Sequence, residues 1–558
     1  MSSRKQKIIA VAGLVAATLA LFTYTVDARR PWFGVYSGQN HDWLTASSVI
    51  FTDNWFREGI WNLRFGMYEE PKSPELSTQI SRDPYISYPP GSVLPVFAIS
   101  LLSNHEPTAG LVMSYDLLNH LLVTLVLSLT VFFFLNSLKL KPVFAAAFAL
   151  VPIALVQLLP SPFYYFQNSF FSDQAVILPF VLAVFLEVLR ADAAGRRRRT
   201  IDILLGLVFF YGAFTDWLFV FVFIAFFLKR LLAREIMLRP WRRFLRGSFG
   251  FAAGFLSGIA LFFIHLTVMM WSNLGWAFEN LYHKYFVRSG IDYDPGFRGR
   301  RYYLNVILGH IQQGYGWFGE LLVLFSILFV ATVGVYIFIK AAGKGVSREV
   351  RRIAQLAFIT VTPCAMQMTV FLEHSAVHSF SALKLAVPLA IVPFVCFPVL
   401  LAVLLRDLVP KLDLSRTLPF VAPAAVATAL LYAVANHGGY RQFFAHQNDY
   451  WYNIVAVTKR HDAPDDVVFS PDMEIPYHPP QPVALSMKRV YLVSSVEQIR
   501  QKLAIATGDY RVEIIFINRP RPGSYWYSAI AGADSSIQDS DGTLYLFFSR
   551  ASIQKLRI

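Results

Sequence analysis

Apolar runs of about twenty residues recur along this chain from Ile8 to Leu431, and they constrain its fold more than any other feature. Each run is long enough to cross a bilayer as one helix, which bonds all its own backbone polar groups. Only 15% of the 558 residues are charged, whereas soluble chains carry about 25%. The sequence therefore predicts an all-α polytopic membrane bundle.

We expect about eleven membrane-spanning helices. Their ranges are 8–26, 112–137, 142–160, 173–190, 201–214, 216–230, 248–270, 318–340, 353–372, 383–405 and 417–435. The segment 201–230 is short for two crossings, but Gly212 and Thr215-Asp216 interrupt it. A single crossing would reverse every basic loop downstream, so two short spans are the better interpretation. Met1–Val26 resembles a signal peptide, and we favour a retained helix because its apolar run is long.

Basic residues occur in each of the short loops on one side of the predicted membrane, and Arg196 to Arg199 form the densest group. This is the positive-inside bias of a plasma-membrane or inner-membrane protein. It accounts for the net charge of +14 without a nucleic-acid partner. The opposite loops, which carry the unusual polar clusters, are then expected on the outer face.

Two large outer loops and a soluble tail are expected around the bundle. In the first loop, 27–111, Phe51–Trp61 and Val93–Ser103 read as interfacial helices. The second loop, 271–317, is polar, aromatic and basic. We assign residues 1–435 to the membrane domain and 436–558 to a small outer α/β domain. Strand-like runs occupy 467–469, 489–493, 513–517 and 543–548, and a helix is expected at 495–503. Cys364 and Cys396 lie in apolar runs, so no disulfide is expected.

The first outer loop holds the candidate catalytic base. Asp42, in His41-Asp42-Trp43, could accept a proton from an incoming hydroxyl, or cap the helix that follows. Asp83 is a second candidate, which could instead pair with Arg82 or begin a turn before Pro84.

Further along the chain, Pro89 and Pro90 fix the backbone and could aim Tyr85 and Tyr88 at a substrate, or form only a structural corner. Asp173 begins a span, where it could stabilise the helix dipole or line a cavity.

Two basic groups in the outer loops are candidate phosphate ligands. A guanidinium binds phosphate through two parallel hydrogen bonds, but it also meets lipid headgroups nonspecifically. The arginines concerned are Arg298, Arg300 and Arg301.

The second group contains His374, His378 and Lys384. A histidine pair at this spacing could polarise a phosphate leaving group, bind a divalent metal ion or be ordinary interfacial residues. Three residues within spans, Asp116, His120 and His265, could pair or line a cavity. The chain contains no Gly-rich phosphate loop, which argues against nucleotide hydrolysis.

The order and common sidedness of these motifs resemble the GT-C superfamily of membrane glycosyltransferases, which includes protein O-mannosyltransferases and the lipid A aminoarabinose transferase. The resemblance covers about residues 8–435. It rests on His41-Asp42, on Tyr88-Pro89-Pro90 before a short apolar helix, on Asp173, and on His374 through Pro388. Two departures are His41, where the family commonly has a second acid, and Tyr88, where some members have Lys.

The resemblance implies an enzyme that moves a hexose or pentose from a polyprenyl-phosphate donor to a hydroxyl on a glycan, lipid or protein acceptor. It implies Asp42 as the base and the basic side chains as phosphate ligands, with His41, Asp83, Tyr85, Tyr88 and Asp173 nearby.

Other classes remain as alternatives. A lipid or glycan transporter should show matching halves and charges near the middle of the membrane, and no such halves are evident. A ligase or polymerase of lipid-linked glycans would share the donor chemistry. A receptor that binds through its outer tail would not need the elaborate first loop.

Overall fold

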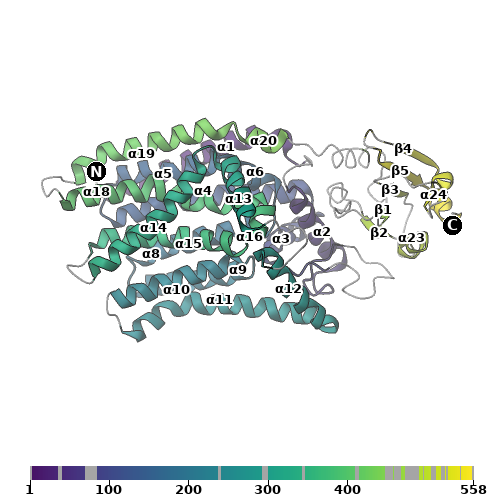
Figure 1. The fold of residues 1–558 in the computed structure, drawn as a ribbon, viewed down its shortest axis with the longest axis horizontal. Helices are drawn as coiled ribbons and strands as arrows, with labels where there is room; N and C mark the ends of the chain where they lie inside the picture. Colours follow the sequence, from purple (N-terminus) through teal and green to yellow (C-terminus); the bar gives the residue numbers. More distant parts are fainter. Residues whose placement is uncertain are drawn as a thin grey trace.

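The protein is described by a computed structural model. It describes residues 3–34, 41–69, 84–236, 240–291, 299–341, 346–408 and 414–445 and, in the C-terminal part, chiefly 467–471, 489–493, 495–503, 511–516, 526–538 and 542–555. Long helices run side by side as one bundle, and a small sheet lies beyond one of its ends (Figure 1). The predicted polytopic bundle with a C-terminal α/β domain is therefore confirmed.

Each of the eleven predicted spans is helical. The helices are α1 (Ser3–Arg29), α4 (Ala109–Ser137), α5 (Pro142–Leu158), α8 (Ile177–Arg190), α9 (Gly195–Ala213), α10 (Leu218–Ile236), α11 (Trp241–Met269), α14 (Gly319–Ala341), α15 (Arg348–Val370), the run α17 (Ala386–Ile391), η6 (Val392–Cys396) and α18 (Phe397–Leu408), and α19 (Leu414–His437). Among the described residues, eight helices are long and apolar enough to span a membrane, or nine if α5 and the bent continuation α6 (Pro160–Asn168) form one span. The predicted number of about eleven is higher partly because α9 begins with four arginines.

Shorter elements connect these spans. They are η1 (Arg30–Trp32), α2 (Trp43–Glu58), η3 (Pro90–Ser92), α3 (Leu94–Ser103), α7 (Ser172–Ala175), η4 (Trp271–Asn273), α12 (Leu274–Ser289), α13 (Arg300–Tyr315), α16 (Leu372–Val377), η5 (Ser379–Leu385) and α20 (Tyr440–Ala445). The second outer loop, for which no helix was predicted, consists largely of the two helices α12 and α13. Their sequences are mixed in polarity, so no clean apolar stripe marked them as helices.

The two ends of the bundle differ in chemistry. At one end the Glu187 carboxylate pairs with Lys229 at 2.7 Å and with Arg230 at 2.6 Å, and Asp192 pairs with Arg348 and Arg352. These contacts join the ends of α8, α10 and α15. The elements α2 and α3 lie at the other end of the bundle, on the side of the C-terminal sheet (Figure 1). The predicted basic loops and the predicted polar clusters are thus separated along the bundle.

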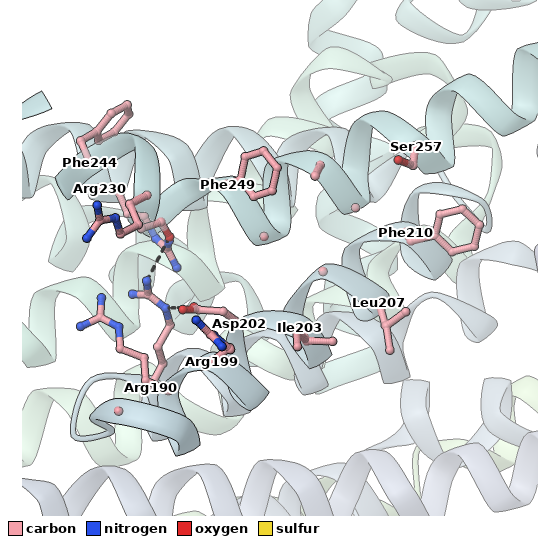
Figure 2. A pocket seen from close by; sticks show the side chains of 18 residues that line it. Arg190, Arg199, Asp202, Ile203, Leu207, Phe210, Arg230, Phe244, Phe249 and Ser257 are labelled. Atoms are coloured by element: carbon pink, nitrogen blue, oxygen red, sulfur yellow. Dashed lines mark hydrogen bonds and ion pairs between the residues drawn. The ribbon is translucent and has the colours of Figure 1, made fainter. Parts of the chain in front are cut away.

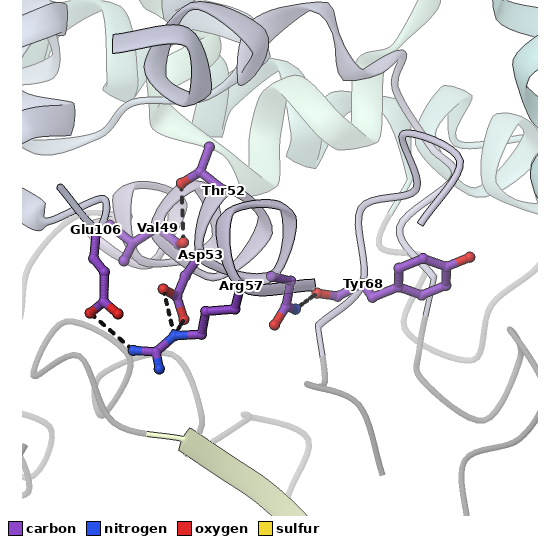
Figure 3. A network of polar contacts seen from close by, with 7 residues as sticks. Val49, Thr52, Asp53, Arg57, Tyr68 and Glu106 are labelled. Atoms are coloured by element: carbon purple, nitrogen blue, oxygen red, sulfur yellow. Dashed lines mark hydrogen bonds and ion pairs between the residues drawn. The ribbon is translucent and has the colours of Figure 1, made fainter. Parts of the chain in front are cut away.

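Helix α2 is not a surface helix, although its pattern suggested one. Phe51 and Trp55, expected to face lipid, are 1% and 0% exposed, and the indole of Trp55 donates to the Gly66 carbonyl at 2.7 Å. Its polar side carries Arg57, which pairs with Asp53 and with Glu106 beyond α3 (Figure 3). The apolar stripe of α2 was predicted correctly. It packs against the rest of the bundle, however, and not against lipid. In α3, by contrast, Leu101 and Leu102 are exposed.

The C-terminal sheet has five strands in the order β2-β1-β3-β5-β4. Strands β1 (Val467–Pro471), β2 (Arg489–Val493) and β3 (Val512–Phe516) are parallel, and β5 (Leu544–Phe548) runs antiparallel to β3 and to β4 (Ser535–Gln538). Helices α23 (Val496–Leu503), α24 (Tyr527–Gly532) and α25 (Arg550–Lys555) accompany it. The four predicted strands are present, and β4 was missed because this edge strand is mostly exposed and polar.

Helices α9 and α11 approach each other through glycines. Gly250, Gly254 and Gly258 follow one another at a spacing of four on α11. A Cβ at Gly254 would lie 2.0 Å from the Gly206 carbonyl oxygen, and one at Gly258 would lie 2.5 Å from that of Phe210. Small residues at this spacing let two membrane helices pack backbone against backbone. The spacing was visible in the sequence and marks α11 as a partner of another helix.

We predict that Gly254→Ala lowers the thermal unfolding midpoint of the detergent-solubilised protein, because the added methyl forces the two helices apart at a cost of about 1–3 kcal/mol. Gly334→Ala in α14 is the matched control, since a Cβ there meets nothing within 4 Å. Equal midpoints for both variants would show that the close approach of α9 and α11 does not stabilise the bundle.

Candidate functional site

The carboxylate of Asp42 is held by a tyrosine and not by the helix it precedes. Asp42 stands at the N-cap position of α2, but its side chain makes no capping hydrogen bond. It is 3% exposed, and the Tyr164 hydroxyl donates to Oδ1 at 2.7 Å. The preceding residue, His41, has a φ of 70°, a conformation that L residues rarely adopt. The capping interpretation is therefore wrong in its chemistry, and the carboxylate is oriented by α6.

The head of α2 is fixed to the segment between α6 and α8. The Thr45 hydroxyl donates to the Asn168 carbonyl at 3.0 Å, and the Ser48 hydroxyl donates to that of Phe170 at 2.7 Å. Ser169 in turn donates to the carbonyl of His41 at 3.1 Å. Because these contacts cross more than 120 residues of sequence, they hold the Asp42 loop in register with the bundle.

Three histidines gather beside this loop. The ring of His378 lies 5.4 Å from that of His41 and 4.6 Å from that of His374, measured between centroids, and it stacks on Phe380. His374 ends up on α16, whereas His378 is extended beyond its C-terminus. The two residues were expected on one helical face. They still meet, but through the turn that follows α16 and not through helical periodicity.

These histidines are neutral in their surroundings. Burial, together with the neighbouring His378, lowers the pKa of His41 to about 3. Burial likewise lowers the pKa of His378 to about 3, aided by Arg288, and holds that of His374 well below its usual range. A neutral imidazole can donate one hydrogen bond and accept another, so the group suits a polar ligand without adding charge.

Two tyrosines and two cations lie next to these histidines. Tyr85 and Tyr88 stack at 6.4 Å, and the Tyr88 hydroxyl lies 3.4 Å from Nε2 of His374. The guanidinium of Arg288 lies over the Tyr88 ring at 5.0 Å, and the Lys284 ammonium over the Tyr85 ring at 5.8 Å. Burial raises the pKa of Tyr85 to about 12, against the opposing effect of Arg288. The tyrosines therefore stay protonated and can donate hydrogen bonds.

The turn that carries the prolines is locked in place. The Gly91 amide donates to the Phe214 carbonyl at 3.0 Å, and the Trp217 indole donates to that of Ser87 at 2.8 Å. A Cβ at Gly91 would lie 2.1 Å from the Phe214 oxygen. The turn is thus a structural corner, and the corner positions Tyr85 and Tyr88.

Asp173 and Lys384 form a buried ion pair between α7 and η5. The two side chains are 2% and 1% exposed, and the ammonium donates directly to the carboxylate. Asp216, in the turn between α9 and α10, lies near both, and burial raises the pKa of its carboxyl against the lowering effect of Lys384. The pair joins the head of α8 to the segment that follows the histidines.

We predict that Lys384→Met or Asp173→Leu alone lowers the free energy of unfolding by about 3–5 kcal/mol, because each leaves a buried charge without its partner. The double variant should recover most of that loss. Thermal unfolding of the solubilised wild type, the two single variants and the double variant measures this double-mutant cycle. Additive losses in the double variant would show that the two side chains do not act as a pair.

The remaining candidates lie apart from this cluster or outside the described residues. Arg300 and Arg301 are exposed at the start of α13. His310, which follows Arg300 by ten residues on α13, donates from Nε2 to the Ala376 carbonyl of α16 at 2.7 Å. At 1.5 Å per residue the two arginines lie roughly 15 Å further along the helix. Asp83 and Arg298 fall outside the described residues.

No metal site is complete in the described part of the chain, where no three His, Cys, Asp or Glu side chains gather closely enough to hold an ion. A divalent metal ion therefore stays a prediction. Within the spans, His120 bonds Arg29 and the Val156 carbonyl, and His265 contacts the Phe65 carbonyl. Asp116 has no hydrogen-bond partner among the described residues. Both cysteines are buried and unbridged, as expected.

Sequence reasoning missed Tyr164 and gave no role to Arg288. Tyr164 lies in Tyr164-Tyr165, within an apolar run, where aromatic residues are ordinary. Its neighbour Tyr165 shares a 2.6 Å hydrogen bond with Ser379. Arg288 was one of several basic residues in the second loop. Only the three-dimensional position of α12 shows that its guanidinium lies over the Tyr88 ring.

The fold is shared with solved membrane glycosyltransferases. The structure of ArnT from Cupriavidus metallidurans bound to undecaprenyl phosphate matches with a TM-score of 0.53 and 12% identity, over 97% of this chain and 98% of that one. ArnT in the apo state matches with a TM-score of 0.52, 10% identity and the same coverage. AglB from Archaeoglobus fulgidus, in complex with an inhibitory peptide and a dolichol-phosphate, matches with a TM-score of 0.45 and 12% identity. That match covers 96% of this chain and 74% of the AglB chain.

The likeness to the two ArnT structures confirms the GT-C fold that the motifs suggested, and together with the apolar helices it supports an integral, multi-pass membrane protein. No protein-family profile matches the sequence. No curated protein matches it at a significant level either.

Proposed function

We propose that this protein is a glycosyltransferase that moves a sugar from a polyprenyl-phosphate donor to a hydroxyl acceptor on the outer face of the membrane. One observation carries the proposal: Asp42 offers a buried carboxylate, oriented by Tyr164, beside the histidine cluster at one end of the bundle. The fold supports it, because the ArnT structure that it resembles was solved with undecaprenyl phosphate bound.

Asp42 is the general base of this proposal. As the acceptor oxygen attacks the anomeric carbon, its proton passes to the Asp42 carboxylate. The bond between the anomeric carbon and the phosphate oxygen breaks, and its electron pair leaves with the polyprenyl phosphate. The Tyr164 hydroxyl bonds one carboxylate oxygen, so it orients the carboxylate that takes the proton.

The leaving phosphate needs positive and donor groups that are already in place. We assign this role to Arg288, with His374 and His378 as neutral donors and Tyr88 between them. Arg288 presents a planar guanidinium that matches a phosphate with two hydrogen bonds. Lys384 is committed to Asp173, so in this proposal it supports the site instead of binding the substrate. We propose that Arg300 and Arg301, which lie further out on α13, contact the headgroup of the lipid donor before it reaches the site.

The residues of the site define only the general class of the sugar and of the acceptor. We propose a hexose or pentose donor and a glycan, lipid or protein acceptor, with the chemistry confined to residues 1–435. In this proposal the sheet and its helices within residues 436–558 form an outer domain beside the reaction site, since the sheet lies at the end of the bundle that carries α2, whereas α20 packs into the bundle core (Figure 1).

We predict that Asp42→Asn lowers the release of undecaprenyl phosphate from undecaprenyl-phosphate hexoses and pentoses by about 10²–10⁴-fold, because an amide cannot accept the proton. Membranes that contain the full chain supply the acceptors, so the assay needs no knowledge of them. Asp53→Asn is the matched control, since Asp53 lies on the same helix and pairs with Arg57 on its exposed side. Near-normal release by Asp42→Asn would exclude it as the base.

We predict further that Arg288→Gln raises the KM for the lipid donor and lowers kcat, roughly tenfold or more together, because a charged hydrogen bond to phosphate is lost. The comparison is Arg301→Gln, which should change the rate less than threefold. Were Arg301→Gln to lose activity while Arg288→Gln kept it, the phosphate would lie at the head of α13 and not at the tyrosines.

A further inference from the structure

The basic end of the bundle contains a large crevice that the proposed reaction does not use. Its volume is about 1200 Å³, and it lies between α9 and α11. This exceeds the roughly 300–1,000 Å³ of typical small-molecule pockets. Figure 2 shows arginines around one end of the crevice and apolar side chains along the other. The lining residues thus form a charged mouth that continues into an apolar groove.

The mouth is strongly positive. Five arginines line the crevice and one carboxylate opposes them. The arginines are Arg190, Arg198, Arg199, Arg230 and Arg246. Of these, Arg190 is committed to the carboxylate of Asp202 and to the Gly247 carbonyl (Figure 2). The net charge of the mouth is therefore suited to an anion.

Arg230 supplies unsatisfied donors inside the crevice. Its side chain is 10% exposed, and Nη2 pairs with Glu187 at 2.6 Å. Its Nε and Nη1 have no hydrogen-bond partner among the described residues, although the guanidinium lies over the Phe251 ring at 4.5 Å. Buried donors are normally satisfied, so an unpaired pair of N–H groups indicates a missing acceptor. A Cβ at Gly247, which lines the crevice, would lie 3.9 Å from Nη1, so this buried atom lies close to the crevice wall.

The first turn of α9 adds to this preference. The helix begins at Gly195, which lines the crevice, and its N-cap residue Ala194 makes no side-chain capping bond. The first amide groups of a helix carry partial positive charge and bind anions. Together with the unpaired donors of Arg230, they provide both charge and directed hydrogen bonds for a phosphate group.

The rest of the crevice is apolar and faces outward. Ile203 and Leu207 on α9 are each 59% exposed, and Phe249 on α11 is 73% exposed. Between them the backbones meet at Gly206, Gly250 and Gly254, which all line the crevice and leave a shallow furrow. A free phosphate or a soluble anion would leave this furrow empty, whereas acyl chains would fill it.

We propose that this crevice is a binding site for an anionic phospholipid from the leaflet at the basic end of the bundle. The phosphate lies among Arg198, Arg199 and the free N–H groups of Arg230, and an acyl chain follows the furrow between α9 and α11. Basic pockets between membrane helices on the cytoplasmic side are known to take such headgroups. The bound lipid would hold α8, α9, α10 and α11 together at this end.

The test uses the full chain in a neutral detergent, with phosphatidylglycerol and phosphatidylcholine as probes. Native mass spectrometry measures how much of each lipid stays bound, and thermal unfolding measures stabilisation by binding. We expect phosphatidylglycerol to bind at least roughly tenfold more tightly than phosphatidylcholine, since its net negative charge meets the excess positive charge of the arginines that line the mouth. We also expect it to raise the unfolding midpoint.

The matched variants use two neighbouring pairs of arginines on α9. Arg198→Gln with Arg199→Gln removes cavity-lining residues and should abolish the preference for phosphatidylglycerol. Arg196→Gln with Arg197→Gln removes the same charge from positions that do not line the crevice and should leave the preference intact. Arg230→Gln should act like the first pair. Equal binding of the two lipids, or equal losses in both double variants, would overturn the proposal and leave only a diffuse basic surface.

Inorganic phosphate separates a lipid site from a headgroup-only site. At millimolar concentration it should fail to displace phosphatidylglycerol, because it gains nothing from the furrow. Displacement by phosphate, or stabilisation by phosphate equal to that by the lipid, would contradict the proposed occupant.

Discussion

The lack of water in the bilayer core is the constraint on which this structure depends. Polar groups inside it must find partners within the protein, so most of the chemistry of the chain is driven to the two ends of the bundle. At one end Glu187 pairs with both Lys229 and Arg230. At the other, Asp42, the histidines and Arg288 gather near the tyrosines. The interior is left largely to aromatic and aliphatic packing. Its polar exceptions include His120, which bonds the Val156 carbonyl, and Asp116, for which the described residues provide no hydrogen-bond partner.

The candidate site is built by long-range hydrogen bonding instead of by any single motif. Its residues come from the loop before α2, the corner before α3, α6, α7, α12 and the turn after α16. Several of these segments are fixed by side-chain hydrogen bonds to the backbone of another element, such as Thr45 to Asn168 and Trp217 to Ser87. The ion pair of Asp173 and Lys384 ties two of these segments together. A site assembled in this way holds its groups rigidly, and rigid placement is what gives a carboxylate and phosphate ligands their effect on a reaction.

The sequence predicted the elements better than it predicted their contacts. Hydropathy located all eleven helical segments, and the break at Thr215-Asp216 correctly separated α9 from α10. The apolar stripe of α2 was recognised, but its burial under the bundle depends on tertiary packing that periodicity cannot show. The pairing of Lys384 with Asp173 crosses 211 residues. Local spacing carries no information on such a contact. The same holds for Tyr164, whose aromatic ring looks ordinary until Asp42 is placed beside its hydroxyl.

The central claim is that one end of this bundle holds the phosphate of a polyprenyl carrier. The most direct measurement is an experimental structure of the full chain with undecaprenyl phosphate bound. The account predicts the phosphate within hydrogen-bonding reach of Arg288 and the histidines His374 and His378, on the same side as Asp42. A phosphate found only in the crevice between α9 and α11, with the cluster beside Asp42 unoccupied, would contradict it.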